Sequence, residues 1–174
     1  RDFAHPLLDA GCGTGWFGAR LSKSGFAVDF LDLSQGMLDQ ARSRMESEKP
    51  RVAPEYFHGG LEQVETLTTK TYALVLAIGD ILSFVDDPVR TLRSLAKRMT
   101  PGGVFLGTVD QKLAGLGHFL ERGELEALAR FAKDGKTVWL GGTKDERFAT
   151  RMYTAEEIRD VFDKAGFDVV DVVG

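Results

Sequence analysis

The sequence predicts an α/β fold in which a mostly parallel, doubly wound, Rossmann-like sheet lies between two layers of helices. Segments with strand patterns alternate with segments of helical periodicity, which is typical of parallel strands joined by crossover helices. A glycine-rich turn at residues 11–15 follows the first apolar segment. The second apolar segment ends in Asp32, 17 residues after Gly15, a spacing typical of nucleotide-binding βαβ units.

Capping residues indicate where several helices begin and end. Ser34 is a suitable N-cap, and Pro88 fits the first position of a helix, where its missing N–H costs nothing. Thr154 and Glu157 form a capping box, and Gly166 suits the end of the same helix. We expect strands over residues 6–10, 27–31, 53–58, 72–78, 103–109 and 168–173. We expect helices over residues 16–24, 35–48, 88–99, 117–132 and 155–165.

Residues 110–152 form an insertion after the fifth strand, within what we expect to be a single domain over residues 1–174. Apolar residues recur at helical spacing from Leu113 to Ala132, and the segments 137–142 and 147–153 predict a β-hairpin. Long connections in compact domains are often lids, so we expect this insertion to cover a substrate. The chain lacks an initiator Met and starts just before its first strand, so we expect truncated termini.

The composition is that of an ordinary globular protein, with 43% hydrophobic and 28% charged residues. The net charge is −4 and the basic residues are scattered, so we expect no nucleic-acid partner. The single Cys excludes an intrachain disulfide and suits the reducing cytoplasm. No apolar run reaches the roughly 20 residues of a membrane span, and no signal peptide pattern is present. We therefore expect a cytoplasmic protein without membrane contact, and we expect no metal site.

The glycine-rich turn suits a ligand that lies against the backbone. Gly11, Gly13 and Gly15 lack Cβ atoms and can adopt positive φ, so we expect the N–H groups of the turn and of the next helix to point at the ligand. Asp9 at the strand tip repels a pyrophosphate but attracts an ammonium group or a hydroxyl. A nucleoside with a cationic or amino-acid tail therefore fits, and the alternative is a tight strand–helix turn without a ligand.

Asp32 is the expected ribose-binding residue. An ionised carboxylate only accepts hydrogen bonds, so it can take both hydroxyls of a cis-diol. Asp29 is the competing candidate, but the two-residue period of a strand places it within the second strand rather than at its tip.

Several motifs carry a family resemblance. Residues 7–15 read Leu-Leu-Asp-Ala-Gly-Cys-Gly-Thr-Gly, residues 32–34 read Asp-Leu-Ser, and residues 37–38 read Met-Leu. Residues 95–103 read Leu-Ala-Lys-Arg-Met-Thr-Pro-Gly-Gly, at the expected turn from a helix to the fifth strand. In this order and spacing the motifs resemble the class I S-adenosylmethionine-dependent methyltransferases, and the resemblance covers residues 7–109 and 153–173.

The resemblance implies that S-adenosylmethionine is the cofactor. By the resemblance, Asp9 and the glycines hold its methionine end, Asp32 holds the ribose, and Leu33 and Met37 flank the adenine. The cofactor-binding residues that it implies are Asp9, Gly11, Cys12, Gly13, Thr14, Gly15, Asp32, Leu33, Met37, Gly60, Leu61, Ala77, Ile78 and Gly79.

Two positions depart from the family pattern. Gly60 stands where the family often has an acidic residue that meets the adenine amino group, so the N–H of Leu61 is the expected contact instead. Ala73 stands where the fourth strand often has Asp, which we expect to affect hydrogen bonding at the strand edge more than catalysis.

Asp80, Asp110 and His118 are the candidate catalytic residues. Asp80 follows the fourth strand, at a position that faces the transferable methyl group in the family. It can orient an acceptor or take its proton. Asp110 ends the fifth strand, and His118 lies in the insertion and titrates near neutral pH. The alternatives are a capping or solvated carboxylate for each Asp and a packed or surface histidine for His118.

The sequence thus predicts a methyltransferase that acts on a small-molecule acceptor by in-line displacement, with positioning as its main catalytic device. One alternative is a catalytically silent methyltransferase-like interaction module. Another is an NAD-type Rossmann oxidoreductase, because Gly13, Gly15 and Gly18 match Gly-x-Gly-x-x-Gly, although Asp9 and the strand register disfavour a pyrophosphate. We expect a monomer or a homodimer, since the given sequence ends after the expected sixth strand, and a partner strand can fill the gap if the family's seventh strand is missing.

Overall fold

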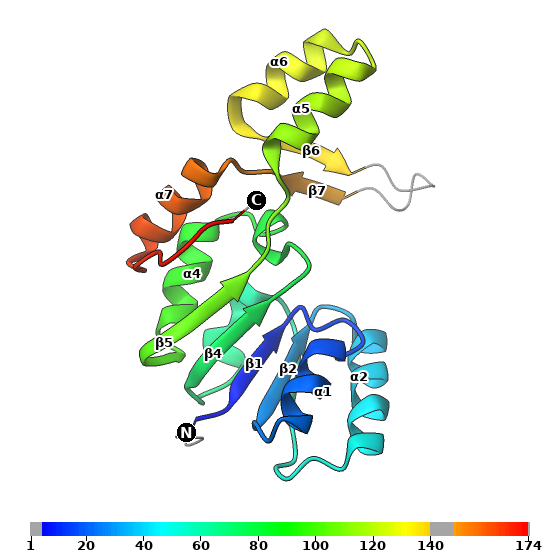
Figure 1. Cartoon of the computed structure of the whole chain (residues 1–174), viewed down its shortest axis with the longest axis vertical. Helices are drawn as coiled ribbons and strands as arrows, with labels where there is room; N and C mark the ends of the chain where they lie inside the picture. The colour runs from blue at the N-terminus through cyan, green and yellow to red at the C-terminus, as the bar shows by residue number, and fades with distance from the viewer. Residues whose placement is uncertain (1–4, 140–147, 174) are drawn as a thin grey trace. The chain divides into compact units, whose positions relative to one another are not determined.

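A computed structural model describes residues 5–139 and 148–173 of the chain (Figure 1). The chain divides into two compact units. The first unit consists of Arg1–Ile81 and Arg90–Thr108, and the second consists of Leu82–Val89 and Val109–Gly174.

The first unit contains the sheet and the helices that connect its strands. Its strands are β1 (Leu7–Ala10), β2 (Val28–Asp32), β3 (Tyr56–His58), β4 (Tyr72–Ala77) and β5 (Met99–Gly107). Its helical segments are α1 (Trp16–Lys23), α2 (Gln35–Glu48), η1 (Leu61–Gln63), α3 (Val64–Leu67), η2 (Ile81–Ser83), which continues into the second unit, and α4 (Pro88–Ala96), which begins there.

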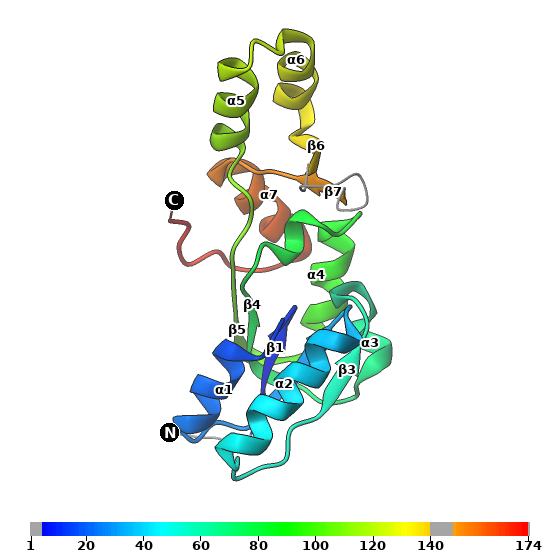
Figure 2. The same ribbon diagram turned by 90° about the vertical axis from the view of Figure 1, so that its right-hand side faces the viewer.

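The sheet has the order β3-β2-β1-β4-β5, and every pair of neighbours is parallel. Helices α1 and α2 cover one face of the sheet, and α3 and α4 cover the other (Figure 2). The predicted mostly parallel α/β fold is therefore confirmed. The carboxyl ends of β1, β2 and β4 are neighbours, which is where ligands bind in open α/β sheets.

The core of this unit packs α1 and α2 against β1 and β2. Strand β1 is buried at all four positions, as expected for a strand covered on both faces. Phe30 of β2 is fully buried, and Leu38, Ala41 and Met45 repeat at helical spacing on the buried face of α2. The Ser34 hydroxyl accepts a hydrogen bond from the Met37 N–H at 3.3 Å, which confirms the predicted start of α2.

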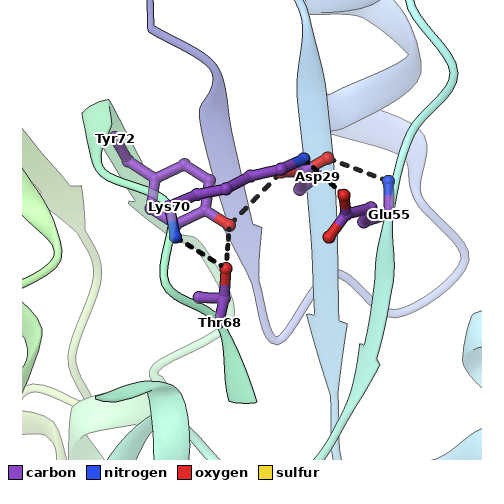
Figure 3. A network of polar contacts seen from close by, with 5 residues as sticks. All are labelled: Asp29, Glu55, Thr68, Lys70 and Tyr72. Carbon is purple, nitrogen blue, oxygen red and sulfur yellow. Dashed lines mark hydrogen bonds and ion pairs between the residues drawn. The ribbon is translucent and has the colours of Figure 1, made fainter. Parts of the chain in front are cut away.

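Five polar residues form a network near the amino ends of β2, β3 and β4 (Figure 3). The Asp29 carboxylate is buried and accepts hydrogen bonds from the Glu55 N–H at 2.8 Å, the Lys70 ammonium at 2.8 Å and the Tyr72 hydroxyl at 3.2 Å. Thr68 accepts from the Lys70 N–H at 3.1 Å. The hydrogen bonds of Asp29 therefore connect β2 to the residues that begin or precede β3 and β4. Asp32, in contrast, lies at the tip of β2.

Replacing Asp29 with Ala should lower the free energy of unfolding by about 2–4 kcal/mol, because the buried N–H and hydroxyl donors lose their acceptor. Lys70 is partly exposed and can turn to water, which limits the loss. The matched control is Glu55→Gln, which removes only a Lys70 ion pair at a half-exposed side chain and should cost less than about 1 kcal/mol. Urea unfolding measures both variants, and equal losses in their free energies of unfolding would contradict this role of Asp29.

The second unit contains α5 (Lys112–Glu121), α6 (Leu125–Asp134), β6 (Lys136–Trp139), β7 (Phe148–Arg151) and α7 (Ala155–Ala165). The strands of the predicted hairpin are confirmed, because β6 and β7 pair antiparallel. Residues 140–147 between them lie outside the described residues. The helix over 155–165 is also confirmed, with the capping box of Thr154 and Glu157 at its start.

Three sequence predictions of secondary structure were wrong. The single helix over 117–132 is two helices, α5 and α6, because Gly123 adopts φ +67° and ends the first of them. The helix expected over 88–99 ends at Ala96, because β5 already starts at Met99. Met99 pairs with Tyr72, and the register between β4 and β5 then shifts before Val104 pairs with Leu74. Residues 168–173 form no strand, and Val170 and Val173 are almost fully exposed.

Candidate functional site

The glycine turn connects β1 to α1 and is anchored to the end of β2. The N–H groups of Gly11 and Cys12 both donate to the Leu31 carbonyl, at 2.7 Å and 3.0 Å. The Gly13 N–H donates to Asp32 at 2.8 Å, and the Gly15 N–H donates to the Cys12 carbonyl at 2.9 Å. The expectation that the turn's N–H groups point at a ligand is thus wrong for these four, because they hold the turn in place.

Positive φ angles explain the three glycines of the turn, since φ is +64° at Gly11, +51° at Gly13 and +71° at Gly15. A Cβ at Gly11 would clash with Ile81, and one at Gly15 would lie 2.8 Å from the Ala41 Cβ. A Cβ at Gly13 would meet nothing within 4 Å. The turn is therefore packed at both ends and open in its middle.

Asp32 places its carboxylate beside the open middle of this turn. One oxygen accepts from the Gly13 N–H and the other accepts from the Ser34 N–H, each at 2.8 Å. These two hydrogen bonds fix the plane of the carboxylate, and each oxygen retains a second lone pair. Asp32 can therefore accept two further hydrogen bonds from a pair of hydroxyl groups.

Asp9 is buried in β1 and reaches the first turn of α1. Its Oδ2 atom accepts a hydrogen bond from the Gly18 N–H at 2.8 Å. Burial raises the pKa of the Asp9 carboxyl to about 6, the Gly18 N–H opposes this shift, and the negative charge of Asp32 adds to it. A nearby cation would stabilise the ionised form of Asp9, so the environment of this carboxyl fits an ammonium group.

Gly18 also belongs to the candidate site, although the sequence analysis named it only as part of the NAD-type alternative. A Cβ at Gly18 would clash with the Phe30 ring and would lie 2.9 Å from Asp9 Oδ2. The glycine therefore lets α1 approach β1 and β2 closely enough to bind Asp9. The signal was present as the third glycine of the Gly-x-Gly-x-x-Gly pattern.

Cys12 is buried, whereas Thr14 is half-buried and is held through its backbone carbonyl. Cys12 packs in the core cluster with α1 and α2, and burial, together with the charges of Asp9 and Asp32, raises the pKa of its thiol far above the usual value. The thiol therefore stays protonated and acts as a small packed residue. The Thr14 carbonyl accepts a hydrogen bond from Arg44 Nε of α2 at 2.8 Å.

Exposed apolar side chains follow Asp32. Leu33 is 70% exposed and Met37 is 39% exposed, next to the carboxyl end of β2. After β3, Gly60 and Leu61 are buried, and the Gly60 N–H donates to the Gln63 side chain at 2.9 Å. A Cβ at Gly60 would clash with the carboxylate of Glu62, so an acidic group does lie at this position, although it comes from a residue two positions later.

The end of β4 forms a strained turn at the same edge of the sheet. Ala77 is buried, Ile78 is half-buried, and Gly79 adopts φ +113° with open space where a Cβ would be. Asp80 adopts φ +62°, which is uncommon for a residue other than glycine and often marks functional sites. The N–H groups of Gly79 and Asp80 both donate to the Thr108 hydroxyl, at 3.1 Å each. The sequence analysis missed Thr108, because no local sequence pattern indicates that it contacts residues 79–80.

Asp110 and His118 belong to the second unit. The Asp110 carboxylate accepts from the Thr150 hydroxyl at 3.0 Å, its carbonyl accepts from the Tyr153 N–H at 2.9 Å, and its N–H donates to Ser83 at 2.9 Å. Asp110 thus links β7 to the start of α5. His118 is exposed on α5 and its ring lies edge-on to that of Phe119, with 5.6 Å between centroids.

Residues 5–139 and 148–173 contain neither a candidate metal site nor a candidate membrane-spanning helix. No group of three or more His, Cys, Asp or Glu residues is placed to hold a metal ion within these ranges. Within the same ranges, no helix is both long and apolar enough to cross a membrane.

A family model described as a methyltransferase domain matches residues 7–103. Malonyl-[acyl-carrier protein] O-methyltransferase from Halalkalibacterium halodurans is 32% identical over 110 residues, which are 61% of this chain and 39% of that protein. Ubiquinone biosynthesis O-methyltransferase from Aliivibrio fischeri is 32% identical over 112 residues, which are 64% of this chain and 47% of that protein. The chain therefore spans less than half the length of these relatives.

A solved structure of a SAM-dependent methyltransferase from Methanosarcina mazei shares the fold. Its TM-score is 0.73 with 17% sequence identity, and the match covers 92% of this chain and 78% of that chain.

Proposed function

This chain belongs to the methyltransferase domain family, and we propose that it transfers a methyl group from S-adenosylmethionine to a small-molecule acceptor. One observation carries the proposal: Asp32 at the tip of β2 is joined to Gly13 of the glycine turn by a 2.8 Å hydrogen bond, so the two halves of the predicted site form a single site. The family match favours neither of the alternatives, the silent module and the NAD-type oxidoreductase.

The residues of this site fit the cofactor in four places. The open space over Gly13 leaves room for a ligand against the backbone, and the carboxylate of Asp32 can accept both ribose hydroxyls. The buried carboxyl of Asp9 gains a counter-ion when an ammonium group binds near it. Leu33 and Met37 offer exposed apolar surface for the adenine, with Gly60, Leu61 and Ala77 completing its surroundings.

Positioning is the main task of the chain in this mechanism. S-adenosylmethionine, when bound, supplies a methyl group on a sulfonium sulfur. Asp9, the turn residues Gly11–Gly15 and Asp32 would hold the donor, and the open turn at Ile78 and Gly79 would leave space for the acceptor to approach. Asp80 would take the proton that the acceptor loses as the acceptor bonds to the methyl carbon, while the bond from that carbon to the sulfonium sulfur breaks and S-adenosylhomocysteine leaves.

The insertion at residues 110–152 is the proposed acceptor-binding element of a single domain. Its support is the chain connectivity, because the insertion follows β5 directly where that strand ends. Asp110 and His118 are then further candidate bases within it. Both named relatives are O-methyltransferases, which makes oxygen the acceptor atom to screen first. We place the protein in the cytoplasm, as a monomer or homodimer that does not act on nucleic acid.

Calorimetric titration with S-adenosylmethionine and S-adenosylhomocysteine tests this function, with NADH as the control ligand. We expect one binding site with an affinity near the micromolar range, about −8 kcal/mol, for both nucleosides, and no binding of NADH. Absence of binding for both nucleosides, or tighter binding of NADH, would contradict the proposed methyltransferase.

The affinity for S-adenosylhomocysteine should fall as the pH falls through about 6, because protonation of Asp9 removes the charge that holds the ammonium group. The sign follows from the raised pKa: Asp9 is ionised above this value and neutral below it. Below pH 6 the dissociation constant should rise about tenfold for each pH unit. The control is Asp9→Asn, which should bind weakly and show no such pH dependence; an unchanged pH profile in this variant would exclude Asp9 as the titrating group.

A further inference from the structure

Helix α2 touches the glycine turn at two points on one of its faces. Ala41 packs against Gly15, where an added Cβ would lie 2.8 Å from the Ala41 Cβ. Three residues later, Arg44 donates a hydrogen bond from Nε to the Thr14 carbonyl at 2.8 Å. Residues three apart on a helix lie on the same face, so α2 meets both residues with one surface.

The middle of the turn is therefore held from two sides, at two successive residues. The Gly13 N–H is bound by Asp32 at the tip of β2, and the Thr14 carbonyl is bound by Arg44 of α2. Asp32 and Arg44 lie on different elements and bind opposite polar groups of neighbouring residues. Without Arg44, the Thr14 carbonyl would lose this charged donor, whereas the Gly13 N–H would keep Asp32 and the Gly15 N–H would keep the Cys12 carbonyl.

The chemistry of Arg44 suits this task. A charged donor forms a stronger hydrogen bond to a carbonyl than a neutral donor does, and the planar guanidinium is rigid compared with a lysine ammonium. Arg44 is half-buried and contacts the turn from a position 30 residues later in the sequence. Arg42, on the same helix, is exposed and places its guanidinium over the Tyr56 ring at 4.3 Å.

We propose that Arg44 is a positioning residue, which sets the affinity of the site by holding the Thr14 carbonyl and so the orientation of the Gly13–Thr14–Gly15 segment. This inference rests on the proposed function, because it assigns Arg44 to the same cofactor site. Arg44 acts through the turn, whereas Asp9 and Asp32 are the residues proposed to bind the cofactor.

The first test measures the turn itself in the protein without ligand. Hydrogen exchange of the Gly13 and Gly15 amides, both hydrogen-bonded in the turn, should be faster in Arg44→Ala than in the wild type. The same amides should exchange at the wild-type rate in Arg42→Ala, the matched loss of a guanidinium from α2. Unchanged exchange of Gly13 and Gly15 in Arg44→Ala would overturn the proposal.

The second test measures binding of S-adenosylhomocysteine by calorimetry. Arg44→Ala should weaken binding about tenfold, the effect of one charge-assisted hydrogen bond, while Arg42→Ala should not change it. Arg44 lines a hollow at the surface together with Gln40, Ser43 and Ser47, so small guanidinium ions can reach the space that Arg44→Ala leaves. Methylguanidinium, at concentrations well below denaturing ones, should therefore restore affinity in Arg44→Ala only.

The outcomes separate this inference from the proposed function. If the wild type binds S-adenosylhomocysteine and Arg44→Ala binds it equally well, the inference is wrong and the proposed function stands. If the wild type does not bind, the proposed function fails, and the amide exchange still decides whether Arg44 holds the turn. If Arg44→Ala does not fold, Arg44→Met replaces it, because methionine keeps a long side chain but has no hydrogen-bond donor. Wild-type exchange and wild-type affinity in Arg44→Met would overturn the proposal.

Discussion

Replacing Gly15 with Ala should destabilise the protein by about 2–5 kcal/mol. A side chain at φ +71° costs roughly 1–2 kcal/mol, and overpacking a closely packed interface adds about 1–3 kcal/mol. The added methyl would lie 2.8 Å from the Cβ and 3.1 Å from the Cα of Ala41, and 3.3 Å from the Phe30 ring. Relief requires a shift of α2, because the nearest atoms belong to or adjoin its backbone.

The matched control is Gly13→Ala, two residues earlier in the same turn. Its φ is also positive, at +51°, but an added Cβ meets nothing within 4 Å, so only the backbone cost of roughly 1–2 kcal/mol remains. Urea unfolding followed by tryptophan fluorescence measures both variants. Equal stability losses in Gly13→Ala and Gly15→Ala would mean that α2 does not press on the turn as described.

Replacing Asp32 with Ala should weaken binding of S-adenosylhomocysteine at least a hundredfold. The variant loses two charge-assisted hydrogen bonds to the ribose, each about 1.5–3 kcal/mol, and it frees the Gly13 N–H that Asp32 fixes at 2.8 Å. Asp32 is partly exposed, so the melting temperature should change much less than the affinity. Calorimetric titration and thermal unfolding of the same sample separate these two effects.

Asp39→Ala serves as the control for Asp32→Ala. Asp39 lies on the exposed face of α2, where it accepts a hydrogen bond from Gln35, and its replacement removes one negative charge without touching the glycine turn. Asp39→Ala should bind S-adenosylhomocysteine as the wild type does. If the two variants bind with the same affinity, Asp32 is not the ribose-binding residue.

The parts of the fold that local chemistry determines could be predicted from the sequence. The start of α2 at Ser34 and both ends of α7 follow from side-chain caps and a terminal glycine, which act within one helical turn. The position of Asp32 at the tip of β2, and of Asp29 inside it, follows from the two-residue period of the strand. These features need no knowledge of distant segments.

Other features depend on contacts between distant segments and were missed or wrong. The β-branched residues at 168–173 favour a strand, but a strand also needs a neighbour, and no described residue pairs with them. The break between α5 and α6 depends on the left-handed conformation of Gly123, which the apolar spacing did not reveal. Arg44 and Thr108 contact the site from 30 and 28–29 residues away, and no local pattern predicts such pairings.

A crystal structure of the protein with S-adenosylhomocysteine bound would show whether Asp32 and the glycine turn form the cofactor site. We expect both ribose hydroxyls to donate to the Asp32 carboxylate, the amino group to lie near Asp9, and the nucleoside to cross the open middle of the turn at Gly13. Density for the nucleoside at another place, or at this edge of the sheet without contact to Asp32, would contradict the proposed site.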